Sequence, residues 1–316
     1  MPESLSTRDA YGRELYELGK ERDDIVVLDA DLSVCTMTAY FAQAFPNRYF
    51  NVGIAEANMM GMAAGMATTG KTVFTNTFAV FSAGRAYDQI RNSIAYPGLN
   101  VKVVGTHAGV SVGEDGATHQ ALEDLATMRA IPGMTVISPA DANETRLAVR
   151  AMAEHAGPCY LRLGRLPVES VTKDIPGYHF ELGKAVLARE GTDATIIATG
   201  TMVPEAIAAA DVLAADGVHV RVLDVHTIKP LDAEAITKAA RETGAIVTAE
   251  EHNILGGLGG AVAEVVAELG IAVPVLRVGV NDRFGHSGKS PELTKAYGLT
   301  ADDVVRQVRE AINRRG

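Results

Sequence analysis

Residues 101–125 read VKVVGTHAGVSVGEDGATHQALEDL, a short apolar run that enters a glycine-rich loop and leaves it in a helical pattern. An apolar run of this kind predicts a strand that is covered on both faces. The loop after the strand holds two histidines and two acids: His107, Glu114, Asp115 and His119. In a parallel sheet, ligands bind beyond the carboxyl ends of the strands. The stretch therefore predicts an α/β fold with a candidate site in this loop.

Strand and helix patterns alternate on both sides of this stretch. In the first half, the strand candidates are 25–30, 72–78, 101–107, 134–139 and 159–164, and the helix candidates are 7–20, 54–69, 82–95, 120–130 and 141–154. In the second half, the strand candidates are 194–200, 218–225, 245–251 and 274–280, with helices from Pro204 and at 232–242 and 259–269. This alternation predicts two doubly wound α/β domains with mainly parallel sheets.

The boundary between the domains is predicted where the periodicity stops. Residues 166–183 lose the pattern and hold two prolines, which is typical of a linker. We therefore expect a first domain at 1–168, a linker at 169–184 and a second domain at 185–316. A chain of 316 residues suits two domains of roughly 150 residues each.

Composition narrows the classes of function. The chain is 47% hydrophobic and 22% charged, as a folded globular protein is, and its net charge is −10. So acidic a surface argues against binding nucleic acid or an anionic membrane, and any phosphate must meet a local arginine cluster. The two cysteines, Cys35 and Cys159, cannot form a disulfide framework. With no apolar leader at the N-terminus and no long apolar run, we expect a cytoplasmic protein.

Two motifs suggest nucleotide binding but lack the required context. Residues 65–72, GMATTGKT, match the phosphate-binding pattern G-x-x-x-x-G-K-[ST], and IVVLD at 25–29 imitates a second NTPase motif. That loop must follow a strand and open a helix, whereas here a predicted helix comes first and a strand follows. Residues 256–262, GGLGGAV, start like a dinucleotide motif, but Val262 occupies the position of the third glycine. The order of elements therefore disfavours an NTPase.

Three further residues become informative only together with the loop. Glu56 begins the helix candidate 54–69, where an acid ordinarily complements the helix dipole. Phe78 and Phe81 lie at a strand-to-helix junction, where core packing is the ordinary explanation. Histidines and acids in a glycine-rich loop are instead suited to proton transfer. The loop alone therefore favours an enzyme.

The segments GIAEAN (53–58), GEDGATHQ (113–120), EEHNILGGLGG (250–260) and NDRFGHSG (281–288) make the chain resemble transketolase along its whole length. The resemblance covers the pyrimidine-binding and C-terminal domains of that family, and the diphosphate-binding half has no counterpart. It implies the smaller subunit of a split transketolase. Such an enzyme uses thiamine diphosphate to move a two-carbon ketol unit from a ketose (phosphate) to an aldose (phosphate), a reaction of pentose phosphate metabolism.

The resemblance also implies roles for individual residues. Glu56 would hydrogen-bond the cofactor's aminopyrimidine ring, which Phe78 and Phe81 would flank, and Glu56, His107 and His119 would be catalytic. The substrate would contact Arg8, Asp31, Cys35, His107, Asp115, His119, Arg162 and Arg165. Two departures leave the sugar open, since Cys35 replaces the family's usual serine and Gly84 the tyrosine of many transketolases.

The absence of a counterpart to the diphosphate-binding half implies partner chains. The resemblance implies a larger subunit that holds the diphosphate through Mg²⁺ (or Ca²⁺), no metal on this chain, and an (αβ)₂ assembly in which this chain also contacts its own copy. The chain alone is expected to be inactive, and its second domain, including His252, to be structural and dimerising. Other hypotheses are a 2-oxo acid dehydrogenase β subunit, which the THQ segment disfavours, the NTPase above, and a non-catalytic scaffold. His107 disfavours deoxyxylulose-phosphate synthase.

Overall fold

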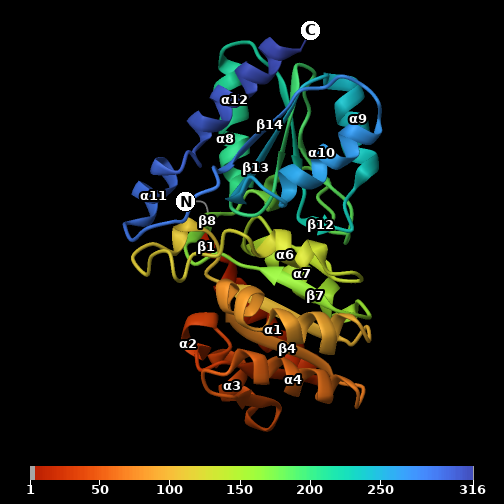
Figure 1. Cartoon of the computed structure of the whole chain (residues 1–316), viewed down its shortest axis with the longest axis vertical. Helices are drawn as coiled ribbons and strands as arrows, with labels where there is room; N and C mark the ends of the chain where they lie inside the picture. The colour runs from red at the N-terminus through yellow and green to blue at the C-terminus, as the bar shows by residue number, and fades with distance from the viewer. Residues whose placement is uncertain (1–3, 316) are drawn as a thin grey trace.

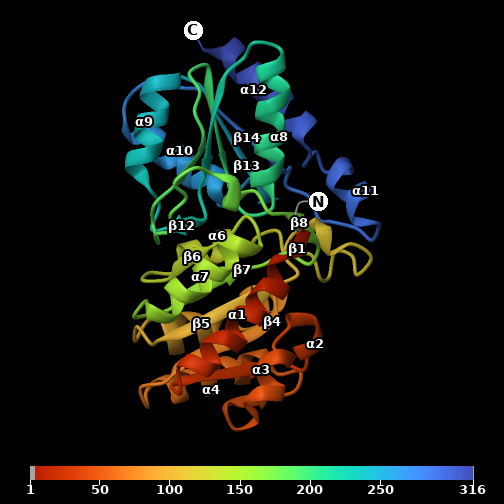
Figure 2. The same cartoon turned by 180° about the vertical axis from the view of Figure 1, so that it is seen from behind.

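A computed structural model describes residues 4–315 of the chain. The two halves of the sequence form two α/β units stacked along the long axis, with the first half below and the second above in Figure 1 and, from behind, in Figure 2. Mainly parallel sheets form the centre of both units, which confirms the predicted fold class. Among residues 4–315, no helix is both long and apolar enough to cross a bilayer.

The first half of the chain forms the strands β1 to β8, the helices α1 to α7 and several shorter helical turns. Its strands are β1 (Ser4–Ser6), β2 (Ile25–Asp29), β3 (Tyr49–Asn51), β4 (Thr72–Phe78), β5 (Val101–Thr106), β6 (Thr135–Ile137), β7 (Cys159–Arg162) and β8 (Pro167–Glu169). Its α-helices are α1 (Thr7–Glu21), α2 (Ser33–Thr36), α3 (Ala39–Ala44), α4 (Glu56–Ala67), α5 (Tyr87–Gln89), α6 (Asp124–Ala130) and α7 (Ala142–Glu154). Shorter turns of helix are η1 (Pro46–Arg48), the π-helical η2 (Phe81–Arg85) and η3 (Ile90–Ala95), η4 (Val110–Val112) and η5 (Thr172–Asp174).

The second half repeats the pattern. Its strands are β9 (Val186–Arg189), β10 (Ala194–Ala198), β11 (Val220–Asp224), β12 (Thr227–Lys229), β13 (Ile246–Asn253) and β14 (Val275–Val280). Its helices are α8 (Met202–Ala215), α9 (Ala233–Thr243), α10 (Leu258–Glu268), α11 (Ser290–Ala296) and α12 (Ala301–Arg314).

The larger sheet has the order β12-β6-β7-β5-β4-β2-β3, and the sheet of the second half has the order β14-β13-β10-β11-β9. Strands β2 and β4 are buried along their whole length, because helices cover both faces of the sheet. Two apolar clusters fill these faces, one under α4 and α6 and one under α1 and α7. The second sheet is likewise covered by α8 and α12 on one face and by α9 and α10 on the other.

Two short pairings join segments that are distant in sequence. Strand β12, from the second half, pairs antiparallel with β6 at the edge of the first sheet. Its Lys229 ammonium group donates to the carbonyl oxygens of Arg129 and Ile131, at 2.8 and 2.5 Å. Strand β1 pairs antiparallel with β8. The second half is therefore built into the edge of the first sheet. The domain boundaries at 168 and 185 stay predictions.

The structure rules out the phosphate-loop interpretation of residues 65–72. Helix α4 ends at Ala67 and β4 begins at Thr72, so the glycine-containing segment follows a helix and enters a strand. Gly70 has a φ of +84° and forms the turn between them. Helix α4 therefore presents its C-terminus to this loop, and not the N-terminus that would receive a phosphate.

Candidate active site

The candidate residues lie at the carboxyl ends of neighbouring strands. In the order β5-β4-β2, the chain leaves the sheet next to His107, Phe78 and Asp31. Two of these, His107 and Asp31, have left-handed φ angles of +57° and +65°, which non-glycine residues rarely adopt. Such backbone costs about 1–3 kcal/mol per residue and is concentrated at functional sites.

An aromatic platform forms the floor of the site. The Phe78 and Phe81 rings are stacked, with centroids 5.8 Å apart and an interplanar angle of 14°. The His107 ring stacks on Phe78 at 4.0 Å, and the His119 ring meets Phe81 edge-on at 5.2 Å. Two histidines from the loop 107–120 therefore lie against the two phenylalanines that the sequence singled out.

Glu56 is joined to this platform through an arginine that the sequence analysis missed. The Glu56 side chain, the first of α4, is 5% exposed, and its Oε1 accepts from Arg85 Nη1 at 3.1 Å. The Arg85 guanidinium lies 4.1 Å from the centroid of the Phe81 ring, and its side chain is 54% exposed. The carboxylate is thus one side chain below the surface. No signal in the sequence pointed to Arg85, because the segment has the pattern of an ordinary helix and forms the π-helix η2 instead.

His107 is held as a neutral imidazole. Burial, the cations of Arg8 and Arg165, and His119 lower the pKa of His107 from 6.5 to about 3. Its Nε2 lies 3.4 Å from Arg8 Nη1, and its Nδ1 lies 2.9 Å from Thr106 Oγ1. A guanidinium can only donate, so Nε2 is the accepting nitrogen. Nδ1 therefore carries the hydrogen and donates it in a hydrogen bond to Thr106 Oγ1. In this tautomer the Nε2 lone pair faces Arg8, so a hydroxyl group that binds there shares it with the guanidinium.

Two arginines meet at the mouth of the site. Arg8 donates through Nε to the Arg165 carbonyl oxygen at 3.1 Å and through Nη1 to the Cys35 carbonyl oxygen at 2.7 Å. Arg165 Nη1 donates to the Val112 carbonyl oxygen at 2.5 Å and lies 3.3 Å from the Asp115 carboxylate. The Arg165 cation contributes, after burial, to lowering the pKa of Arg8, so the two charges act on each other, and such a pair suits a doubly charged tetrahedral anion. Asp31, at the end of β2, accepts instead from Asn51 Nδ2 at 2.8 Å.

Arg162 does not join this group. Its side chain is 7% exposed, its Nε donates to Asp124 at 2.8 Å, and its Nη2 donates to the Glu251 carbonyl oxygen at 2.8 Å. The guanidinium is therefore occupied inside the protein, between the two halves of the chain. The expectation that Arg162 contacts substrate is therefore wrong, because a buried cation that is bonded to Asp124 and to the Glu251 backbone has no access to one.

The residues present fit the pyrimidine end of thiamine diphosphate. Phe78 and Phe81 supply a stacking surface, and the buried Glu56 carboxylate adjoins it. Among the described residues, the arginines near this site are Arg8 and Arg165 at the mouth and Arg85, which pairs with Glu56 beside the platform.

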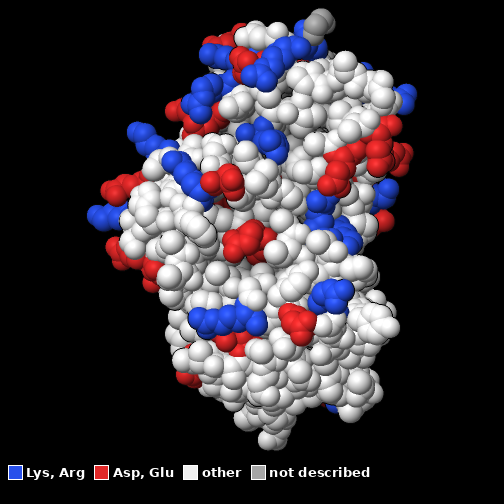
Figure 3. All heavy atoms as spheres, viewed as in Figure 1, with Lys and Arg blue, Asp and Glu red and all other residues white. Residues whose placement is uncertain are grey.

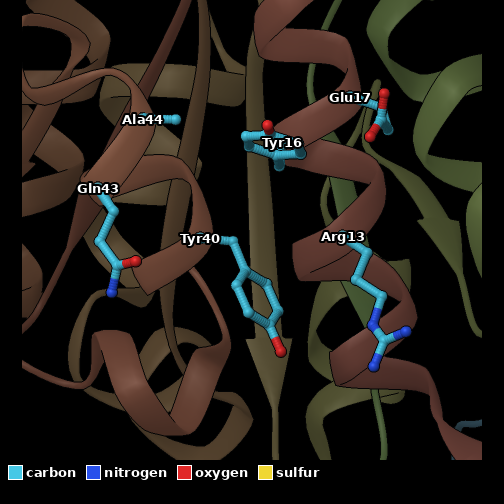
Figure 4. Close-up of a pocket in the computed structure, with 6 residues that line it drawn as sticks. All are labelled: Arg13, Tyr16, Glu17, Tyr40, Gln43 and Ala44. Carbon is cyan, nitrogen blue, oxygen red and sulfur yellow. The ribbon is translucent and has the colours of Figure 1, made fainter.

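A voluminous groove lies elsewhere on the first half. About 670 Å³ in size, it runs between α1 and α3 and is lined by Arg13, Tyr16, Glu17, Tyr40, Gln43 and Ala44 (Figure 4). None of these residues contacts the aromatic platform or Glu56 in the hydrogen bonds and ring contacts described above. Volume alone therefore does not identify the site, whose residues line an open face of the first half.

Two protein families match successive parts of the chain. Residues 3–169 match the transketolase pyrimidine-binding domain, and residues 183–304 match the transketolase C-terminal domain. A transketolase C-terminal section from Methanocaldococcus jannaschii is 50% identical over 307 residues, 97% of this chain and 96% of that protein. A 6-deoxy-6-sulfo-D-fructose transketolase subunit from a Clostridium strain is 47% identical, over 98% of this chain and 95% of that protein.

A solved structure has the same fold throughout. Described as a split gene transketolase in an inactive beta4 tetramer, it is 52% identical and superposes with a TM-score of 0.90. The match covers 99% of this chain and 100% of that one. The two chains therefore share both α/β units and their arrangement.

Proposed function

Since the chain belongs to the transketolase family, we propose that it is the smaller subunit of a thiamine diphosphate-dependent transketolase. It moves a two-carbon ketol unit from a ketose to an aldose. The observation that carries the proposal is one unbroken series of contacts, from Glu56 through Arg85 to the Phe81 and Phe78 rings and on to His107. The series joins a buried carboxylate, a stacking surface and a hydrogen-bond acceptor on one open face of the first half.

Each residue of the series has a role that its surroundings support. Glu56 shares a proton with the ring nitrogen of the aminopyrimidine, and Phe78 and Phe81 hold that ring by stacking, worth about 0.5–1.5 kcal/mol beyond burial. When bound, the cofactor supplies an electron sink for the two-carbon fragment. His107 accepts a hydrogen bond from a sugar hydroxyl at Nε2, and His119, from the exposed tip of the loop, holds a further hydroxyl. A proton transfer to or from a hydroxyl held in this way contributes roughly 10²–10⁴-fold to a rate.

The charged end of the sugar binds at the arginine pair. Arg8 and Arg165 supply the cations, Cys35 and Asp115 contact them, and Asp31 is the further substrate contact that the family resemblance implies. A guanidinium binds phosphate and sulfonate by the same hydrogen-bonded geometry. One relative is named for a sulfonated ketose, so the anion at this end distinguishes family members. We propose a phosphate here, because a dianion best matches two cations, and we place the reaction in cytoplasmic sugar-phosphate metabolism.

A larger subunit completes the enzyme in an (αβ)₂ assembly and holds the diphosphate through Mg²⁺ (or Ca²⁺). The matches to two transketolase domains support this, as does the inactive state described for the 52% identical chain. The surface of α4 supports it as well. Gly61 and Gly65 are exposed with nothing within 4 Å of an added Cβ, so a second helix can approach closely. The lower part of the face in Figure 3 also carries few charged side chains.

The proposal is tested by Glu56→Gln in the enzyme reconstituted with its larger subunit. We expect ketol transfer between a ketose phosphate and an aldose phosphate to fall at least about 100-fold, since the variant loses the carboxylate proton exchange. Size-exclusion chromatography should show the same assembly as the wild type. Glu154→Gln, at a 77% exposed position, is the matched control and should leave the rate unchanged. Full activity of the Glu56 variant would refute the proposal.

A further inference from the structure

The loop 107–120 has an exposed tip carried on buried flanks. Residues 114–119 include most of its accessible side chains, among them His119. The flank Val110–Val112 is buried as the short helix η4, and Gln120 is 4% exposed. Whatever holds the flanks therefore sets where the tip and its histidine lie.

The second half of the chain holds these flanks by direct hydrogen bonds. Ser290 Oγ donates to the Ser111 carbonyl oxygen at 2.8 Å, and Gln120 Nε2 donates to the His286 carbonyl oxygen at 3.1 Å. The Ser111 N–H donates to Glu251 Oε1 at 2.7 Å. These bonds connect residues separated by more than 130 positions, so local sequence does not encode the loop's position.

Glu251 is the central member of this set. It lies near the end of β13, is 4% exposed, and its second oxygen accepts from Thr201 Oγ1 at 3.0 Å. Its carboxylate lies so close to Gly109 that an added Cβ would meet Oε1 at 2.2 Å. Gly109 also has a φ of +84°, so only glycine fits there. Burying a charge is costly unless it is paired, and the Arg162 cation supplies attraction to Glu251.

The neighbouring Glu250 is comparable to Glu251 in type and burial but makes no contact with the loop 107–120. Successive side chains of a strand point to opposite faces, so Glu250 is directed away from the loop. It is also buried, and it accepts from the N–H groups of Leu258 and Gly259 at 2.7 and 2.8 Å, at the start of α10. Both glutamates thus accept two hydrogen bonds, but only Glu251 reaches the loop 107–120.

We propose that Glu251 is a positioning residue for transketolase chemistry, which fixes the loop 107–120 over the aromatic platform from the second half of the chain. The role of Glu251 rests on the proposed function. It means that the second half of the chain contributes to the reaction by positioning a loop of the first half. Glu251 touches neither cofactor nor substrate. It acts through the Ser111 N–H and through contact with Gly109 on the position of His107 and His119.

The first test is amide hydrogen exchange in the isolated chain, which needs no activity. Glu251→Ala should raise exchange about tenfold or more in peptides that cover 108–121. Glu250→Ala should raise it at the start of α10 and leave 108–121 unchanged. Glu251→Gln should largely restore the wild-type pattern, because its amide can accept from Ser111 and donate to Thr201. Equal loop exchange in the two alanine variants would overturn the proposal.

The second test uses the enzyme reconstituted with its larger subunit. Glu251→Ala should lower kcat about 10- to 100-fold and leave the half-saturating thiamine diphosphate concentration unchanged, because Glu56, Phe78 and Phe81 lie on other elements. If this variant does not fold, Glu251→Asp replaces it. The shorter side chain cannot reach both Ser111 and Thr201, so amide exchange in peptides that cover 108–121 should rise at least threefold. Unchanged kcat, or an equal loss of cofactor affinity, would overturn the proposal. An active Glu56→Gln enzyme would refute the proposed function and leave the exchange result standing.

Discussion

A buried pair of acids between the two halves of the chain should make stability depend on pH. Glu144, from α7, and Asp224, at the end of β11, are both fully buried. Glu144 accepts from the Ala140 N–H at 2.6 Å and from the Tyr178 hydroxyl at 2.7 Å. Asp224 has no donor among residues 4–315 for either oxygen, and Asp141 is a third acid nearby. The two carboxyl groups can therefore coexist only by sharing a proton.

The magnitude follows from this arrangement. Burial, with a smaller contribution from Asp141, raises the pKa of Glu144 from 4.5 to about 7. Burial and the Glu144 charge raise the pKa of Asp224 well above its ordinary value. At 1.36 kcal/mol per tenfold change in proton affinity, ionising Glu144 in the folded protein costs roughly 3 kcal/mol. The folded chain holds a proton that the unfolded chain releases, so this stability is complete below pH 4.5 and is lost as pH rises through about 7.

Glu144→Gln should remove most of this dependence, because the amide cannot ionise and its N–H can donate to Asp224. Relative to wild type, the free energy of unfolding should rise by up to roughly 3 kcal/mol between pH 5 and pH 8.5, or about 5 °C in Tm. Thermal and urea unfolding followed by circular dichroism at several pH values measure this. Asp23→Asn, at a fully exposed position, is the control. A difference between variant and wild type that is the same at pH 5 and pH 8.5 would refute the reasoning.

Two other substitutions test the arginines. Arg8→Ala should raise KM for a phosphorylated ketose about 10- to 100-fold, the value of a charged hydrogen bond, and change KM for the unphosphorylated ketose far less. Steady-state kinetics with both sugars decides, and equal effects would contradict the phosphate assignment. Arg162→Ala should lower the free energy of unfolding by about 3–5 kcal/mol, because it leaves Asp124 buried without its cation. An unfolding curve identical to wild type would show that the pair is not structural.

The regular elements were predictable because their signals are local. The apolar run 72–78 is β4 to the residue, and the candidate 141–154 becomes α7 with only its first residue outside, where Asp141 serves as the N-cap. Buried parallel strands need continuous apolar residues, and amphipathic helices need a repeating face. The predicted helix 82–95 was less regular than expected, since it is interrupted by the two π-helical turns η2 and η3.

What the sequence could not predict depends on distant partners. The strands β1 and β8 are three residues each and pair across more than 160 positions, so neither has a recognisable pattern. Arg162 and Arg165 are three residues apart and chemically alike, yet one ends β7 inside the protein and the other follows it into the mouth of the site. Only the surrounding fold distinguishes them. The roles of the other candidate residues stay predictions, although the structure brings most of them together.

The pairing of β12 with β6 has a practical consequence for anyone who would study one half alone. A fragment that stops at the linker would lose the strand that covers β6, and its sheet would end in unpaired backbone groups that invite association with other chains. It would also lose the Lys229 anchor on the turn after α6. A protein designed to contain the first half alone should therefore also include residues 227–229, by fusion or circular permutation, so that β6 keeps its partner strand.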